Sequence, residues 1–128
     1  MKIIALTAIL SLLLTSCGAQ AKPQGDYMRI DQDRAADIMA SGEEHIILDV
    51  RRPDEFAAGH IPGAVNIPNE TIGSEDIAQL PDKNAVILVY CRSGNHSKQA
   101  SAKLAAMGYT NIMEFGGINS WTGEIVTD

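Results

Sequence analysis

Basic residues, aromatic side chains and cysteines are all scarce in this chain. Its 128 residues include 10 lysines and arginines against 16 acidic residues, which gives a formal net charge of -6. Such a chain repels phosphate backbones at long range, so nucleic acid is not expected as a partner. Aromatic residues make up only 5% of the chain, which predicts a mostly aliphatic core. The length allows one domain, which we expect to be monomeric.

The sequence patterns of two kinds of bound group are also missing. No glycine-rich nucleotide loop is present, so no nucleotide cofactor is expected. The candidate metal ligands are Cys91, His45, His60 and His96, and only Cys91 and His96 lie close together in the sequence. One such pair falls short of the compact ligand sets that metal sites use, so we expect no metal.

The first 17 residues differ in character from the rest. Lys2 precedes an almost unbroken apolar run from Ile3 to Leu14. This run is shorter than the roughly 20 residues of a membrane-spanning helix. Small residues then lead to a cysteine in Leu14-Thr15-Ser16-Cys17, a pattern typical of a secretory signal peptide. Its end resembles a bacterial lipobox. The alternatives are an ordinary signal peptide cleaved nearby and a buried N-terminal helix.

The lipobox resemblance implies cleavage before Cys17 and a lipid on its thiol. Residues 1–16 are then a lipoprotein signal peptide, 17–27 a lipidated tether and 28–128 the folded domain. We expect an exported protein, anchored to the cell envelope on its periplasmic face. Gly18 stands where some Gram-negative lipoproteins carry an aspartate retention signal, which favours the outer membrane.

The chain has two cysteines, Cys17 and Cys91. An exported protein with two cysteines normally suggests a disulfide. If Cys17 carries lipid, Cys91 remains a free thiol in a compartment that tends to oxidise thiols. A free thiol is a liability there unless it has a function, so Cys91 is the first candidate for chemistry.

Short apolar runs alternate with helical patterns after the tether. We predict strands at residues 28–30, 45–50, 64–67, 85–90 and 111–113. Helices are predicted after Asp31, from Pro53 and over 97–107, with a weak one in 69–80 and a last short helix or turn at 118–121. This alternation predicts an α/β fold, a central parallel sheet with helices on both faces.

The run from Ala85 to Tyr90 is apolar throughout, which predicts a strand in the middle of the sheet. Ligands bind at the carboxyl ends of such strands, where Cys91 follows. Gly94 and Asn95 tolerate positive φ, so the chain can curl there and point its amides inward. Amides and a helix N-terminus favour an exposed thiolate at Cys91. The alternative is a buried structural cysteine.

The segment Cys91-Arg92-Ser93-Gly94-Asn95 resembles the active-site loop of rhodanese-domain sulfurtransferases. The resemblance continues upstream in Leu48-Asp49-Val50-Arg51 and in residues 55–56 and 59–68. It continues downstream in residues 108–109 and 116–117 and at Trp121, and so covers roughly residues 28–125. Three motifs in the same order make this more specific than one short motif. The resemblance implies a single rhodanese-like domain.

The resemblance also implies a reaction. Cys91 attacks the outer sulfur of a donor such as thiosulfate and becomes a persulfide, and a thiol or cyanide-like acceptor removes that sulfur. No cofactor is implied. The loop backbone holds the transferred sulfur, with Arg92, Ser93, Gly94, Asn95 and His96 as its binding residues.

Loop length and its last residue refine this interpretation. The resemblance associates sulfur transfer with a six-residue loop, here 91–96, and phosphate or arsenate chemistry with one residue more. Many relatives end the loop in arginine, where this chain has His96. Arginine is always charged, whereas histidine switches near pH 6.5. If His96 binds an anion, the rate of sulfur transfer to cyanide is expected to fall as the pH rises through neutral. A His96→Ala protein with the same pH profile as the wild type would exclude that role.

Asp49 and Arg51 end a predicted strand near the site. They could orient the loop or the substrate, but a buried ion pair of Arg51 with Asp49 or Glu55 is favoured, because charges at buried strand ends usually pair. Two other functions stay open beside sulfur transfer. One is a non-catalytic rhodanese-like binding module, and the other is a thiol redox sensor.

Overall fold

The computed structural model describes residues 26–73 and 75–127. Cys17, the predicted signal peptide and most of the predicted tether lie outside these residues. Within them, five parallel strands form one sheet in the order β1-β5-β4-β2-β3. The elements along the chain are β1 (Met28–Arg29), α1 (Gln32–Ala40), β2 (Ile46–Asp49), α2 (Pro53–Ala58), β3 (Val65–Asn66), η1 (Asn69–Thr71), β4 (Val86–Cys91), α3 (Asn95–Ala106), β5 (Asn111–Gly117) and η2 (Ile118–Ser120).

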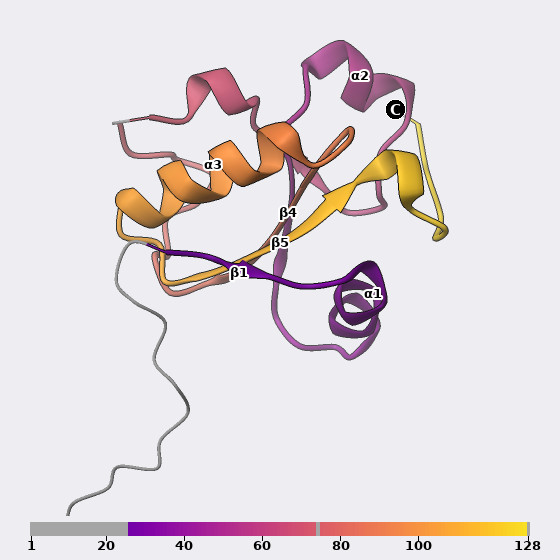
Figure 1. Ribbon diagram of the computed structural model, residues 1–128, viewed down its shortest axis with the longest axis horizontal. Coiled ribbons are helices and arrows are strands. Elements are labelled where there is room, and N and C mark those ends of the chain that lie inside the picture. Colours follow the sequence, from indigo (N-terminus) through magenta and orange to yellow (C-terminus); the bar gives the residue numbers. More distant parts are fainter. Residues whose placement is uncertain (1–25, 74, 128) are drawn as a thin grey trace, which may run out of the picture.

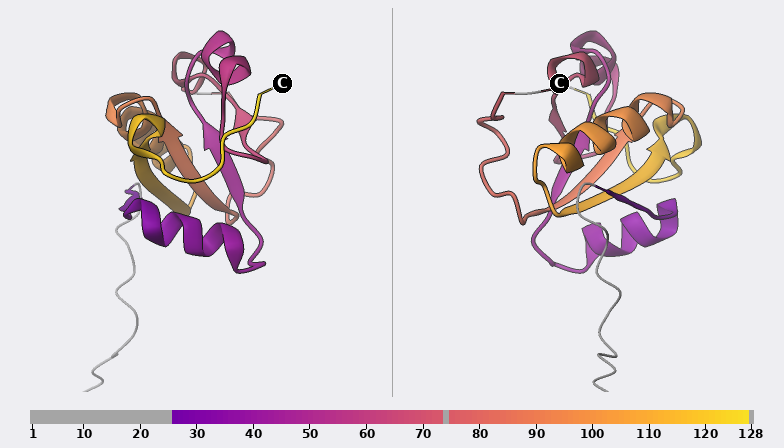
Figure 2. Two further views of the ribbon diagram at one scale, coloured as in Figure 1. Left: turned by 90° about the vertical axis from the view of Figure 1, so that its right-hand side faces the viewer. Right: turned by 60° about the vertical axis from the view of Figure 1, so that its left-hand side comes forward.

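Helices α1 and α3 lie on opposite faces of the sheet (Figure 1), and Figure 2 shows the same layers from two further sides. The central strand β4 explains how both faces are filled. Alternate side chains of a strand point to opposite faces. Leu88 and Tyr90 join the core on the α1 side, whereas Val89 and Cys91 join the core on the α3 side. The predicted central strand is confirmed, and its alternation directs Cys91 toward α3.

Helix α1 begins as its sequence predicts. The Asp31 side chain accepts a hydrogen bond from the Arg34 backbone N–H at 2.7 Å. This cap satisfies a donor that the first helical turn leaves free. Ala35 and Ile38 are buried on its inner face.

Several elements differ from the sequence-based prediction. The weak helix predicted in 69–80 is limited to the 3-10 helix η1. Helix α3 begins at Asn95, two residues before the predicted start, because Gly94 takes a φ of +109° and lets the chain enter the helix directly. Strand β5 continues to Gly117 instead of ending at Met113. The strand continues through the charged Glu114 because this side chain is 1% exposed and finds polar partners inside the protein.

The chain joins the domain before β1. Tyr27, the last residue of the predicted tether, is half-buried and packs against the core on the α3 side.

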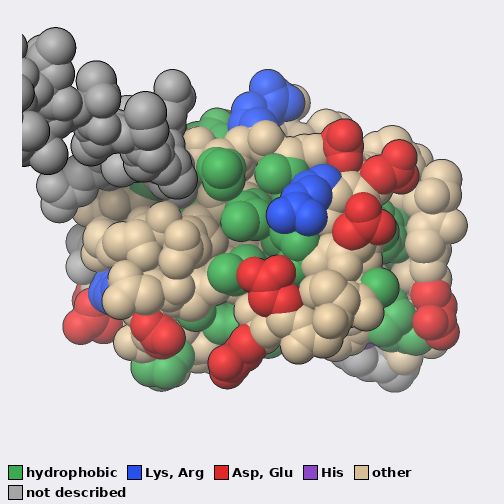
Figure 3. All heavy atoms as spheres, turned by 90° about the horizontal axis from the view of Figure 1, so that it is seen from below, with side chains coloured by type: hydrophobic (Ala, Val, Ile, Leu, Met, Phe, Trp, Pro, Cys, Tyr) green, Lys and Arg blue, Asp and Glu red, His purple; other side chains and the backbone are tan. Residues whose placement is uncertain are grey.

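The face in Figure 3 mixes hydrophobic side chains with acidic and basic ones. No helix within residues 26–73 and 75–127 is long and apolar enough to cross a membrane.

Candidate active site

Cys91 is the last residue of β4 and one wall of a cavity of about 360 Å³. It is only 2% exposed, so the expectation of an exposed thiol is wrong, because strand alternation turns the side chain inward under α3. The Gly94 backbone N–H donates to Sγ at 3.0 Å. The Ser97 hydroxyl oxygen lies 3.3 Å from Sγ. The sulfur therefore sits at the N-terminus of α3 with an amide directed at it, an arrangement that favours negative charge.

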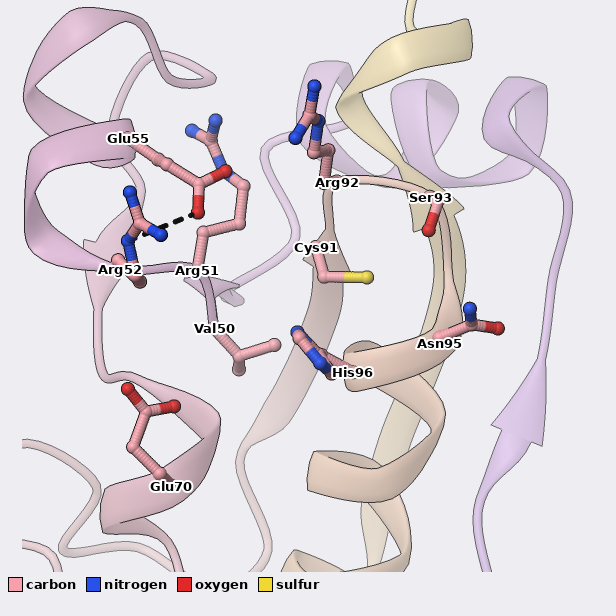
Figure 4. A pocket seen from close by; sticks show the side chains of 10 residues that line it. All are labelled: Val50, Arg51, Arg52, Glu55, Glu70, Cys91, Arg92, Ser93, Asn95 and His96. Carbon is pink, nitrogen blue, oxygen red and sulfur yellow. Dashed lines mark ion pairs between the residues drawn. The ribbon is translucent and has the colours of Figure 1, made fainter.

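The rim of the cavity comes from the same loop. Arg92, Ser93, Asn95 and His96 are exposed and line the cavity, whereas Gly94 is buried. Figure 4 shows these side chains on the β4 and α3 side of the opening. The structure therefore brings together the loop residues that the sequence singled out. Gly94 contributes through its amide and its conformation.

The end of β5 and the following η2 contact the backbone of this loop. The Asn119 N–H donates to the Arg92 carbonyl at 3.1 Å. A Cβ atom on Gly117 would lie 2.1 Å from the Arg92 carbonyl oxygen and 2.7 Å from the Ser93 Cα. Gly117 has a φ of -134°, so the close approach of two backbones, and not its conformation, requires glycine here.

Arg51 and Asp49 form the buried ion pair that the sequence favoured. The Arg51 Nη2 lies 2.8 Å from Asp49 Oδ2 and also donates to the Gly59 carbonyl at 2.6 Å. Burial lowers the pKa of Arg51, but the hydrogen bond and charge of Asp49 outweigh it and raise the pKa above its ordinary value. Burial, and then the nearby Asp49, raise the pKa of Tyr90 far above its ordinary range. Arg51 also lines the cavity, so its charge reaches the site while Asp49 holds it in place.

The opposite wall holds residues that the sequence did not single out as cavity residues. Val50, Arg52, Glu55 and Glu70 line the cavity across from the loop (Figure 4). Arg52 pairs with the exposed Asp54 at 2.7 Å and with Glu55 at 3.7 Å. The hydrogen bond from Arg52 lowers the pKa of Asp54 to about 2. Arg92 has no ion pair within residues 26–73 and 75–127, so its guanidinium stands available to an anion.

A buried polar group lies under the sulfur. The Ser97 hydroxyl is 2.9 Å from Glu114 Oε1, and both side chains are at most 1% exposed. Glu114 Oε1 also accepts the Gly116 N–H at 2.9 Å, and its Oε2 lies 3.5 Å from Arg29 Nε. Ser97 and Glu114 were not predicted from the sequence as site residues. The sequence feature that could have identified Glu114 is its charge, because its neighbours in β5, Met113 and Phe115, are apolar.

Other singled-out residues lie elsewhere. His60 stacks on Phe56 with ring centroids 3.8 Å apart, and its Nδ1 lies 2.8 Å from the Phe56 carbonyl oxygen. Trp121 packs against Phe115 and lines a separate, apolar cavity beside α1. Among the described residues, no group of three or more His, Cys, Asp or Glu could hold a metal ion.

Comparison with known proteins agrees with this geometry. A family model described as rhodanese-like domain matches residues 31–124. This chain belongs to the rhodanese-like family. A rhodanese-like domain protein of Staphylococcus aureus has a solved structure that matches with a TM-score of 0.69 and 28% identity, over 79% of this chain and 98% of that one. The predicted fold, a single rhodanese-like α/β domain, is confirmed.

Two bacterial relatives are short proteins of similar extent. Thiosulfate sulfurtransferase PspE of Escherichia coli is 41% identical over 71 residues, which cover 56% of this chain and 68% of that protein. Thiosulfate sulfurtransferase GlpE of Pseudomonas entomophila is 34% identical over 97 residues, 75% of this chain and 85% of that protein. The chain spans only about a quarter of a longer relative, adenylyltransferase and sulfurtransferase UBA4 of Candida albicans, at 34% identity and 27% of its length.

Proposed function

We propose that this rhodanese-like protein transfers sulfane sulfur through a persulfide on Cys91. The observation that carries the proposal is the Gly94 N–H directed at Sγ, 3.0 Å away, in a cysteine that lines the cavity. An amide donor there stabilises a thiolate and then the sulfur that it receives. Thiosulfate is the proposed donor, since two relatives are named thiosulfate sulfurtransferases. The acceptor is a thiol or a cyanide-like nucleophile, and the reaction needs no cofactor.

The reaction proceeds in two displacements. The Cys91 thiolate attacks the outer sulfur of thiosulfate, the sulfur–sulfur bond of the donor breaks, and sulfite leaves with the bonding electrons. The acceptor then attacks the outer sulfur of the persulfide and regenerates the thiolate. Arg92 and His96, exposed at the rim, meet the anionic donor. Because sulfite leaves before the acceptor reacts, the kinetics are ping-pong.

Mass spectrometry of the intact protein tests this function. The domain treated with thiosulfate is expected to gain about 32 Da, one sulfur atom, and to lose it when cyanide is added. The Cys91→Ala protein is expected to show neither change. A wild-type protein that gains no sulfur from any sulfane donor would contradict sulfur transfer and favour a binding module. Oxygen adducts formed only with peroxide would favour a redox sensor.

We also propose that the protein is an exported lipoprotein, anchored through Cys17 on the periplasmic face of the envelope. Support comes from Lys2, the apolar run and the small residues before Cys17. Residues 1–16 serve as signal peptide and the segment after Cys17 as tether. Replacing Cys17 by alanine is expected to release the protein from the membrane fraction. Retention of the Cys17→Ala protein in membranes would contradict the anchor.

A further inference from the structure

We infer that Glu114 is a positioning residue that takes up the proton of Cys91 through the hydroxyl of Ser97. The inference rests on the proposed function, because it concerns how the same thiol becomes a nucleophile. Three atoms carry it: Cys91 Sγ, Ser97 Oγ and Glu114 Oε1, joined by distances of 3.3 Å and 2.9 Å. The residues are 2%, 0% and 1% exposed. The atoms between the sulfur and Glu114 are therefore shielded from solvent, and Glu114 is the proton acceptor that they connect to the thiol.

The Ser97 hydroxyl has several possible hydrogen-bond partners but only one proton, and this supports the inference. The Ser97 oxygen lies within hydrogen-bonding distance of Glu114 Oε1, of the Gly94 carbonyl at 3.0 Å and of the Gly116 carbonyl at 3.3 Å. The two carbonyl groups can only accept a hydrogen bond, and so can Glu114 when it is ionised. Ser97 has one proton to give. With Cys91 as a thiol, the S–H donates to Ser97 and Ser97 donates to Glu114, so the chain of donors runs unbroken from sulfur to carboxylate.

A thiolate beside an ionised Glu114 breaks this chain. Cys91 becomes a fourth acceptor around the one Ser97 proton, and two negative charges share a buried site, an arrangement that burial disfavours. Moving the proton removes both conflicts. The S–H bond breaks and its proton goes to Ser97 Oγ, while the original Ser97 proton goes to Glu114 Oε1. The Cys91–Ser97 and Ser97–Glu114 hydrogen bonds reverse their direction with the heavy atoms in place, and the buried charge stays at one.

The proton returns at the end of the cycle. No atom changes its oxidation state in the proton transfer, and Glu114 holds the proton while Cys91 carries the sulfur. When the acceptor removes the sulfur, the regenerated thiolate takes the proton back from Ser97, and Ser97 takes one from Glu114. The Gly94 N–H donates to the sulfur throughout, since its position does not depend on the proton.

The surroundings of Glu114 leave it suited to this role. From β1, Arg29 approaches its Oε2 at 3.5 Å, but this guanidinium is 65% exposed and so partly solvated. From α3 it faces the hydroxyl of Ser97, and from its own strand the Gly116 N–H. From α1, the neutral Gln32 amide donates to the Gly117 carbonyl beside it. The two oxygens of Glu114 therefore face one partly solvated guanidinium, one hydroxyl and one backbone amide.

The rate of Cys91 alkylation by iodoacetamide, measured against pH, tests the inference without any sulfur donor. A Glu114→Gln side chain keeps an oxygen acceptor for Ser97 and Gly116 but cannot take up a proton. The pH of half-maximal alkylation is expected to rise by about one unit, and the rate at pH 7 to fall about tenfold. A rate that is unchanged or higher would overturn the relay, because loss of a mere negative neighbour would favour the thiolate. The exposed Glu43→Gln is the matched control and should leave the pH profile unchanged.

Substitutions at Ser97 keep the inference testable if Glu114→Gln fails to fold. Ser97→Ala removes the bridging hydroxyl and is expected to raise the pH of half-maximal alkylation in the same direction. Ser97→Thr retains the hydroxyl and should restore most of the rate. A folded Ser97→Ala protein with the wild-type pH profile would exclude the relay. Because alkylation needs no sulfur donor, a protein that forms no persulfide yet shows these shifts would contradict the proposed function and leave the relay standing.

Discussion

Replacing Gly117 by alanine is expected to reduce sulfur transfer to cyanide about 100-fold, since a shift of about 1 Å in a site can cost that much. The new Cβ would lie 2.1 Å from the Arg92 carbonyl oxygen and 2.5 Å from its carbon, both backbone atoms. Neither can rotate away as a flexible side chain could. The 91–96 loop must therefore move, and the Gly94 N–H moves with it. Overpacking is also expected to lower the free energy of unfolding by about 1–3 kcal/mol.

Gly73→Ala is the matched control for this substitution. A Cβ at Gly73 meets no atom within 4 Å. Its activity and thermal midpoint are expected to stay near those of the wild type. Steady-state transfer rates and thermal unfolding of the two variants provide the comparison. Wild-type activity in Gly117→Ala would show that the loop position does not depend on its contact with β5.

The Arg51→Ala protein is expected to lose roughly 3 kcal/mol of unfolding free energy. Asp49 is fully buried, and Arg51 supplies it with a charge and with hydrogen bonds from Nε and Nη2 at 3.1 and 2.8 Å. Without Arg51, a carboxylate remains buried and unpaired. The Gly59 carbonyl also loses its donor, at 2.6 Å from Nη2. Urea denaturation followed by circular dichroism measures the loss.

The neighbouring Arg52 is the natural control. It also forms an ion pair, at 2.7 Å from Asp54, but both side chains are about two-thirds exposed. Exposed pairs contribute little, so Arg52→Ala should leave stability near that of the wild type. Adding Asp49→Asn to Arg51→Ala should recover part of the loss, because the unpaired charge is removed. Equal stability losses for Arg51→Ala and Arg52→Ala would show that burial of the pair does not matter.

The main features of the fold follow from short sequence patterns. The apolar run before Cys91 predicted the central strand, because a strand buried on both faces needs no polar position. The glycine and polar residues after it predicted the turn into α3, and Gly94 indeed takes a positive φ. The sequence did not predict that β5 extends past Met113, because a charged residue such as Glu114 is expected to be exposed unless its partners are known. Those partners, Ser97 and Arg29, come from other elements.

The sequence by itself determined to which family the domain belongs and predicted which cysteine reacts, because the loop and its flanking strand are contiguous in the chain. Only the tertiary structure decided what surrounds that cysteine. Strand alternation buried Cys91 under α3, and parallel pairing of β4 with β5 brought Glu114 beneath Ser97. Arg52, the residue before α2, and Glu70 in η1 also line the cavity. Such contacts join residues distant along the chain, and no local pattern encodes the distance between them.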